Sequence, residues 1–149
     1  MTFVVDPFIF DPADEKHARA LARLESEQVA WFGTIGRDGF PHSVPIWFLW
    51  RDGRALIMSE PGSVKVRNLR ENDRVIFHLE SGDDGEQWTI LRGTAAISPE
   101  PSSEWLDRIE AEYTAKYDEW LQRLGITTES MAGRYTALIE FTPAKAILQ

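Results

Sequence analysis

The sequence predicts a mainly β fold, an antiparallel barrel with flanking helices, for this chain of 149 residues. Two Asp-Gly turns, at Gly36–Gly39 and Arg51–Arg54, lie between apolar, β-prone runs, and Asp-Gly in that setting is a strong hairpin signal. Strands joined by tight hairpins, with few helices, favour an antiparallel barrel over parallel βαβ units. The length fits a single domain over 1–149, which we expect here.

The first expected element is a helix within the N-terminal segment, residues 1–28. Asp11 suits the N-cap and Pro12 the first helical position, where the missing N–H of proline removes no helical hydrogen bond. Apolar residues then follow at helical spacing, and the helix is expected to end near Gln28.

Three strands are expected next, Val29–Ile35, Pro41–Trp50 and Ala55–Ser59, joined by the two Asp-Gly turns. After Pro61-Gly62 a short helix begins at Ser63, whose hydroxyl can accept a hydrogen bond from an early helical N–H.

The second half of the chain predicts one more hairpin, Arg74–Ser81 with Gln87–Ser98, around the acidic turn that contains Asp83 and Asp84. A long helix over 102–124 follows, because apolar side chains recur there every three to four residues. The last strand is expected over Tyr135–Phe141, with an extension beyond Pro143 to Leu148.

Composition narrows the possible functions. The chain has no cysteine, which excludes disulfides, thiolate metal sites and cysteine nucleophiles. Its net charge of −8 argues against nucleic-acid binding, which needs a basic face. No apolar run is long enough to cross a membrane, and the first residues lack the basic region of a signal peptide. We therefore expect a cytoplasmic location, with neither nucleic acid nor membrane as a partner.

The segment Ser59–Asn72 carries the clearest functional signal. Ser63 heads the short helix, and Lys65 and Arg67 follow within one turn. Cationic side chains beside the free N–H groups of a helix start form a plausible phosphate seat. The alternative is a capped surface helix that binds nothing, and this segment alone does not separate the two.

A second signal is Pro45, which interrupts the apolar strand Pro41–Trp50. Proline removes a donor from the strand ladder, so it belongs at a sheet edge, at a bulge, or where another group approaches. One interpretation is an ordinary irregular edge strand. The other is a backbone surface that hydrogen-bonds a planar ring, with Trp47 and Trp88 beside it, although core packing is the commoner role of tryptophan.

Other patterns favour no chemistry. Gly33, Gly36 and Gly39 lack dinucleotide-binding spacing and indicate a hairpin turn. The three histidines are scattered, so no metal site is expected. Ser43 has no nucleophile elbow around it, which argues against a hydrolase.

Four features of the chain carry a family resemblance: the strand order from Val29, the Val-Pro-x-Trp-Phe segment, the Ser-x-Lys-x-Arg-Asn-Leu block from Ser63 and the Asp-x-Arg-Val that follows it. In these features the chain resembles the pyridoxamine 5'-phosphate oxidase-like split-barrel family. The similarity is strongest over Glu25–Ile97 and is greatest to the actinobacterial branch that uses the deazaflavin coenzyme F-420. It implies a six-stranded split β-barrel and a homodimer with cofactor sites at the subunit interface.

The resemblance also implies site residues. Lys65 matches the lysine that meets the cofactor phosphate, Val44–Trp47 match the strand that lines the flavin or deazaflavin ring, and Trp88 matches a ring-side position. The implied cofactor-binding set is Ser43, Val44, Pro45, Ile46, Trp47, Met58, Ser59, Ser63, Val64, Lys65, Asn68 and Trp88. No catalytic side chain is identified.

The function that follows from the resemblance is an oxidoreductase that uses F-420, or alternatively FMN, to transfer a hydride to or from a small conjugated molecule. The alternative is a carrier of a flavin, deazaflavin or haem-like ligand without turnover. The sequence lacks the Arg-Leu-rich C-terminal segment that grips pyridoxal phosphate in true pyridoxamine phosphate oxidases, so oxidation of vitamin B6 is not expected. Arg37, Arg51, Arg54 and Arg92 are candidates for a basic rim around the carboxylates of F-420.

Overall fold

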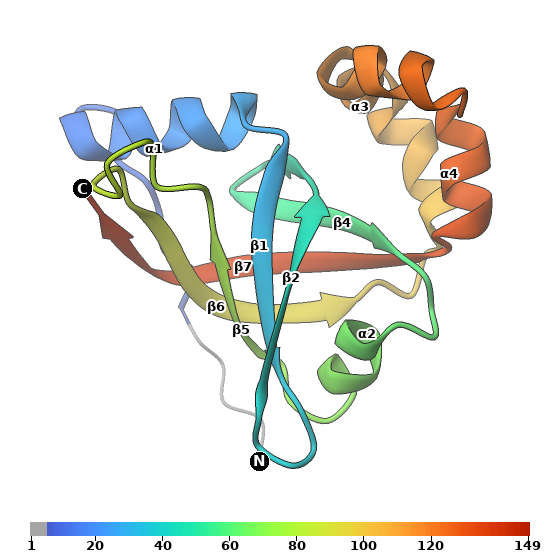
Figure 1. Ribbon diagram of the computed structural model, residues 1–149, viewed down its shortest axis with the longest axis horizontal. Helices are drawn as coiled ribbons and strands as arrows, with labels where there is room; N and C mark the ends of the chain where they lie inside the picture. Colours follow the sequence, from blue (N-terminus) through green and yellow to red (C-terminus); the bar gives the residue numbers. More distant parts are fainter. Residues whose placement is uncertain (1–5) are drawn as a thin grey trace.

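The structure, a computed structural model, describes residues 6–149; residues 1–5, which begin the segment predicted as N-terminal and helical, lie outside it. Four helices and seven strands follow one another in this part of the chain (Figure 1). The order is α1 (Glu15–Ser26), β1 (Val29–Ile35), β2 (Pro41–Trp47), β3 (Leu49–Arg51), β4 (Arg54–Ser59), α2 (Val64–Leu69), β5 (Arg74–His78), β6 (Thr89–Ile97), α3 (Ser102–Leu124), α4 (Thr128–Arg134) and β7 (Ala137–Leu148).

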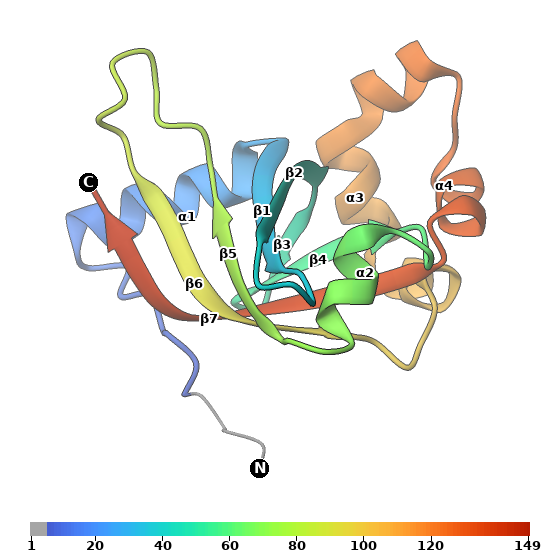
Figure 2. The same ribbon diagram turned by 60° about the horizontal axis from the view of Figure 1, so that its bottom comes forward.

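All seven strands form one antiparallel sheet with the order β2-β1-β5-β6-β7-β4-β3. The two edge strands, β2 and β3, are consecutive in the chain, so the sheet has to curl until its edges approach each other (Figure 2). The mainly β, antiparallel fold with flanking helices predicted from the sequence is confirmed.

The strand predicted over Pro41–Trp50 is divided at Phe48, which explains why there are seven strands rather than six. Phe48 is fully buried, and its backbone N–H donates to the Tyr117 hydroxyl at 2.9 Å. Its carbonyl accepts from the Lys116 ammonium at 2.8 Å. Because side chains of α3 bond both the N–H and the carbonyl of Phe48, the chain can pass from one edge strand of the sheet to the other within a single residue.

The sequence misplaced the start of one helix and missed another helix. The first helix begins after Asp14 rather than Asp11, since the Asp14 carboxylate accepts from the N–H groups of Lys16 and His17. The helix α4 was not predicted at all. Its start is fixed by a reciprocal pair of hydrogen bonds. The Thr127 hydroxyl accepts from the Ser130 N–H, and the Ser130 hydroxyl accepts from the Thr127 N–H.

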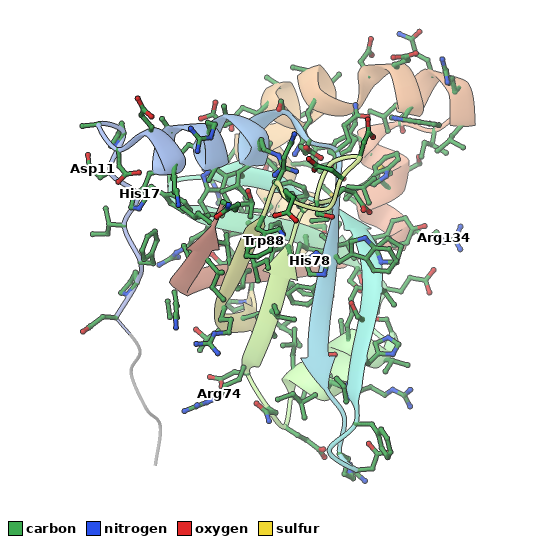
Figure 3. The ribbon with its side chains drawn as sticks, turned by 60° about the vertical axis from the view of Figure 1, so that its left-hand side comes forward. Asp11, His17, Arg74, His78, Trp88 and Arg134 are labelled. Atoms are coloured by element: carbon green, nitrogen blue, oxygen red, sulfur yellow. The ribbon has the colours of Figure 1, made fainter. Side chains whose placement is uncertain are left out.

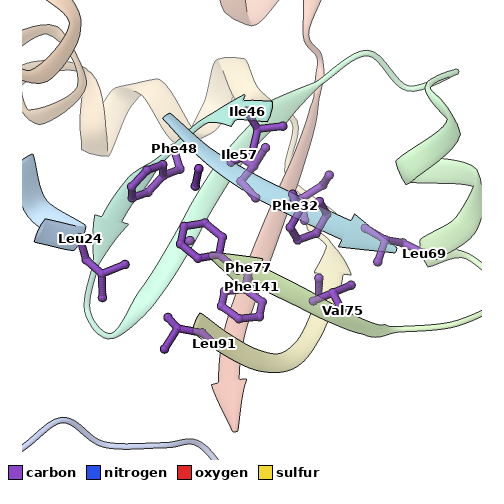
Figure 4. Packing of buried hydrophobic residues seen from close by; sticks show 14 of the residues in the cluster. Leu24, Phe32, Ile46, Phe48, Ile57, Leu69, Val75, Phe77, Leu91 and Phe141 are labelled. Carbon is purple, nitrogen blue, oxygen red and sulfur yellow. The ribbon is translucent and has the colours of Figure 1, made fainter. Parts of the chain in front are cut away.

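Two apolar clusters hold the fold together. The first fills the curled sheet and contains Phe32, Phe77 and Phe141 with residues of α1 and α2 (Figure 4). The second lies between the outer side of the sheet and α3 and α4, and includes Leu56, Tyr113 and Leu138. The helices α3 and α4 are therefore part of the packed structure and form a wall beside β4.

The strand β7 continues through Pro143, because a bulge in its pairing with β6 accommodates the proline. Gly93 lies opposite Pro143, and a Cβ atom on Gly93 would lie 2.0 Å from the Thr142 carbonyl oxygen. Only glycine permits this close approach. None of the helices in residues 6–149 has the length and apolar character needed to cross a membrane.

Candidate functional site

A cleft of about 340 Å³ lies between the barrel and the α3–α4 wall. The barrel side comes from β2, β4 and the start of α2, and the opposite side comes from α3, α4 and the loop between them. The lining residues are Pro45, Ile46, Trp47, Met58, Ser59, Glu60, Ser63, Lys65, Tyr113, Leu124, Ile126, Met131 and Tyr135.

The segment from Ser59 to Lys65 is held in place by local hydrogen bonds. The buried Ser59 hydroxyl lies 2.9 Å from the Ser63 hydroxyl, which also caps α2 by accepting from the Val66 N–H at 3.4 Å. Val66 and Leu69 are buried in the barrel cluster. Because these two side chains anchor α2 on the barrel, Lys65 is left on the side of the helix that faces the cleft.

Lys65 is the cation of this cleft. Its side chain is half-buried, and it forms no ion pair within residues 6–149. Burial lowers the pKa of Lys65, and the charge of Glu60 partly offsets this effect. Glu60 itself is engaged by Arg134, whose Nε lies 3.0 Å from Oε1. A partly desolvated ammonium without a carboxylate partner gains stability when it binds an anionic ligand.

The floor of the cleft is the end of β2. This strand has one strand neighbour in the described part of the chain, β1, so its other edge is unpaired. Pro45 therefore lies on an edge strand, one of the placements that the sequence left open for it. Trp47 stacks on Tyr117, with ring centroids 4.5 Å apart and an interplanar angle of 9°. This contact fixes the indole as a rigid part of the cleft.

Comparison with known proteins fits this geometry. A family model described as pyridoxamine 5'-phosphate oxidase matches residues 15–149. The chain belongs to this family. The family predicted from the sequence is therefore confirmed, and the cleft can be compared with what the resemblance implied.

Solved structures share the fold over almost the whole chain. An F420 reductase has 20% identity and a TM-score of 0.67, with 86% of this chain and 95% of that chain covered. A conserved hypothetical protein from Mycobacterium tuberculosis has 24% identity and a TM-score of 0.71, with coverages of 98% and 88%. HutZ, a heme storage protein from Vibrio cholerae, has 11% identity and a TM-score of 0.65, with coverages of 91% and 95%. At these identities the similarity shows the split-barrel fold alone.

The cleft of this family member brings together many of the residues predicted to bind cofactor, namely Pro45, Ile46, Trp47, Met58, Ser59, Ser63 and Lys65. Two others lie close by on β2. Val44 packs against the barrel core, and Ser43 lies on a hollow on the outer face of the sheet.

Val64 and Asn68 lie on the other side of α2, in a separate groove that also contains Arg67. The Asn68 amide donates to the hydroxyl of Thr34 at 3.0 Å, which ties α2 to β1. In this structure the amide thus has a structural partner, and the helix itself separates it from the cleft.

Trp88 is far from the cleft. It precedes β6 in the loop of the β5–β6 hairpin, whereas α2 lies at the opposite end of that hairpin (Figures 1 and 3). The Trp88 indole donates to the Gly85 carbonyl at 2.7 Å, and the residue is 40% exposed. Within one chain it does not reach a ligand at Lys65.

Three of the arginines considered for a basic rim are neutralised. Arg37 pairs with Glu71 at 2.6 Å, Arg51 with Glu112 at 3.2 Å and Arg54 with Glu140 at 3.7 Å. Arg92 has no ion pair in the described part of the chain and lies on the outer hollow of the sheet. Within residues 6–149 no three side chains of the metal-binding types gather at one place.

Sequence reasoning missed the helical wall of the cleft. Tyr113 lies in the long helix predicted over 102–124, where the apolar periodicity by itself indicates packing. Met131 belongs to α4, and Tyr135 follows α4 directly. The available signal was Thr127 and Glu129 shortly after Gly125, a pattern typical of a new helix start after a helix end.

Proposed function

We propose that this protein is an oxidoreductase that binds coenzyme F-420, or alternatively FMN, and transfers a hydride to or from a small conjugated organic molecule. The observation that carries the proposal is Lys65, a half-buried cation without an ion-pair partner in the described residues, in an apolar cleft beside the unpaired edge of β2. Membership of the family and the fold shared with an F420 reductase support it.

The donor set of the cleft fits a phosphorylated ring cofactor. The Lys65 ammonium and the Ser63 hydroxyl would hold the phosphate. The edge of β2 at Pro45 and Trp47 would position the ring, and Ile46 and Met58 would exclude water from it. When bound, such a cofactor supplies the hydride chemistry, so the protein needs no nucleophile of its own.

The experiment is a fluorescence titration of the purified protein with oxidised F-420 and, side by side, with FMN. The wild-type protein should bind F-420 with the lower Kd. Lys65→Ala should raise that Kd about tenfold or more, because a charge-assisted contact is lost. Lys16→Ala removes an exposed lysine on α1 and is the matched control. If neither cofactor binds, or if Lys65→Ala binds as tightly as the control, the proposal is wrong.

A carrier without turnover is the second candidate, and one feature of the cleft favours it. No histidine, aspartate or cysteine is among the residues that line the cleft, and its one glutamate is paired with Arg134. Steady-state reduction of an artificial acceptor by the reduced cofactor separates the two candidates. Tight binding with no turnover indicates a carrier, whereas turnover that Lys65→Ala weakens indicates an enzyme.

We also propose that the protein is a homodimer that pairs through the outer face of β1, β5, β6 and β7. This face carries the partly exposed isoleucines Ile76 and Ile147, and Ile76 lines a hollow of about 510 Å³ there. Arg92 and Lys145 are directly opposite each other on β6 and β7, and neither has an ion pair in residues 6–149. Like charges placed in this way destabilise a sheet unless an anion lies between them.

The acidic turn of a second copy is the anion that we infer for this face. The turn carries Asp83, Asp84 and Glu86 and lies at one end of the β5–β6 hairpin, whereas Arg92 lies partway along it, opposite Ile76, and Arg74 lies at the other end. A two-fold axis across the face, placed between this turn and Arg92, would bring the acidic turn of each copy to the cations of the other, which is an isologous contact. In such a dimer Trp88, which lies between this turn and β6, would be close to the partner copy.

A further inference from the structure

Tyr113 differs from the other buried tyrosine of α3. It is 2% exposed and packs against Tyr117, with ring centroids 4.9 Å apart. The Tyr117 hydroxyl is fully used: it bonds the N–H and carbonyl of Phe48 and the carbonyl of Gln28. The Tyr113 hydroxyl, in contrast, makes no hydrogen bond to any residue that the structure describes.

This hydroxyl opens into the Lys65 cleft. No fully buried side-chain oxygen or nitrogen in residues 6–149 lacks a partner, so the small exposed part of Tyr113 includes its unpartnered oxygen. Tyr113 lines the cleft, and the cleft is the space that this residue can reach. The Tyr113 side chain is almost fully buried while its hydroxyl has no partner among the described residues, so a ligand in the cleft is the group that can satisfy it.

The hydroxyl carries its proton at neutral pH. Burial raises the pKa of Tyr113 well above its usual value, and the nearby Tyr135 raises it further. Tyr113 is therefore a hydrogen-bond donor that faces the cleft from α3, while Lys65 faces it from α2. Both walls thus offer donors, and the surface between them is apolar.

We propose that Tyr113 is a ligand-binding residue, whose hydroxyl donates to an anionic group that Lys65 holds from the other wall of the cleft. Leu124, Ile126 and Met131 lie on the same wall as Tyr113 and contact the apolar body of the ligand. The ligand class is an amphipathic anion with a flat apolar body and a negatively charged group that reaches Lys65. This inference rests on the proposed function only in naming the cofactor phosphate as the physiological anion.

Two probes test it without any flavin. 8-Anilinonaphthalene-1-sulfonate has a flat apolar body and a single sulfonate, and N-phenyl-1-naphthylamine has the same body without the charge. The ratio of their Kd values reports how much the anionic group contributes to binding. We expect Tyr113→Phe to weaken binding of the sulfonate about three- to tenfold and to leave binding of the neutral amine unchanged.

Two variants calibrate the test. Lys65→Met should reduce the preference for the sulfonate at least as strongly as Tyr113→Phe, and Lys16→Met should leave it unchanged. Since Tyr113 forms no hydrogen bond within residues 6–149, Tyr113→Phe should keep the melting temperature of the wild type, which excludes misfolding as the cause of a change. The double variant should lose less than the sum of the two single losses, because both donors act on one group.

The inference is overturned if Tyr113→Phe leaves the ratio of the two Kd values at the wild-type value, or if it weakens both probes equally. The first outcome means that the hydroxyl does not meet the anion, and the second that it only shapes the apolar wall. Neither outcome bears on the flavin titration. Conversely, a normal response to the probes with no binding of F-420 or FMN would reject the proposed function alone.

Discussion

The hydroxyl of Tyr117 lies 2.9 Å from the backbone nitrogen of Phe48, the single residue that separates the two edge strands of the sheet. The same hydroxyl donates to the Phe48 carbonyl at 3.0 Å or to the Gln28 carbonyl at 2.5 Å. One side chain of α3 therefore satisfies the backbone where β2 ends and where β1 is about to begin. This is the point at which the curled sheet closes.

Replacement of Tyr117 by Phe should test that role. The substitution keeps the ring stack on Trp47 but leaves buried backbone groups without a partner, at a cost of about 1–3 kcal/mol in the free energy of unfolding. Urea denaturation measures the loss. Tyr113→Phe, one turn earlier, is the matched control and should change the unfolding free energy little. Equal stability of the two variants would contradict the assigned role.

Lys116 should make stability depend on pH. Its ammonium donates to the Phe48 carbonyl at 2.8 Å and lies 3.6 Å from the centre of the Phe48 ring. Burial lowers the pKa of Lys116 to about 7, and Glu27 only partly opposes this shift. Between about pH 7 and the unfolded value near 10.5, the unfolded chain binds the additional proton, so the free energy of unfolding should rise with pH.

The measurement is a series of urea melts between pH 7 and 9.5, below the ordinary pKa of tyrosine. Lys116→Met keeps the aliphatic stem and removes the titrating group, so its curve should be flatter than that of the wild type. The slope is the quantity to compare, because the substitution also removes a hydrogen bond at every pH. Parallel curves would show that Lys116 titrates normally.

Gly93→Ala should damage the pairing of β6 with β7. The new Cβ atom would lie 2.0 Å from the Thr142 oxygen and 2.8 Å from the Pro143 Cα, both backbone atoms that cannot rotate away. Forced repacking of this kind costs about 1–3 kcal/mol. Gly133→Ala in α4 is the control, since nothing lies within 4 Å of its Cβ position. That variant should be about 0.5–1 kcal/mol more stable, and thermal unfolding distinguishes the two.

The sequence predicted the parts of the fold that depend on local signals. The two Asp-Gly turns form as expected, with Gly39, Asp52 and Gly53 at positive φ. The division at Phe48 was not predictable, because it depends on Tyr117, 69 positions later in the chain. The first helix start was misplaced because Asp11 and Asp14 both suit a cap, and only the folded chain shows which one bonds the helix.

The same distinction between local and long-range signals applies to the cleft. The short segment from Ser59 to Lys65 carries its own cap and cation, so one wall of the cleft was visible in the sequence. The other wall was not, because Tyr113 follows the periodicity of an ordinary packed helix. Only the absence of a partner for its hydroxyl among the described residues distinguishes it, and that is a property of the three-dimensional structure.

Ile76→Glu should prevent dimer formation. Ile76 lies on the proposed dimer face, opposite Gly33 on β1 and Arg92 on β6, and is 38% exposed. The new carboxylate would lie beside Arg92 of its own chain and compete with the acidic turn of the partner, and the apolar contact of Ile76 would be lost. Sedimentation velocity should show a dimer for the wild type and a monomer for the variant. Ile9→Glu is the matched control, because Ile9 is 84% exposed and precedes α1, so it belongs to none of the four strands of the face.

Salt gives this prediction a second, independent readout. If the acidic turn of each copy meets Arg92 and Lys145 of the other, the dimer should dissociate more readily as ionic strength rises, because exposed charge pairs are screened within about 8–10 Å. Arg92→Glu should weaken the dimer at low salt, and Asp84→Lys in the same chain should partly restore it by reversing both charges. A wild-type monomer at all concentrations, or a dimer that Ile76→Glu leaves intact, would remove this face from consideration.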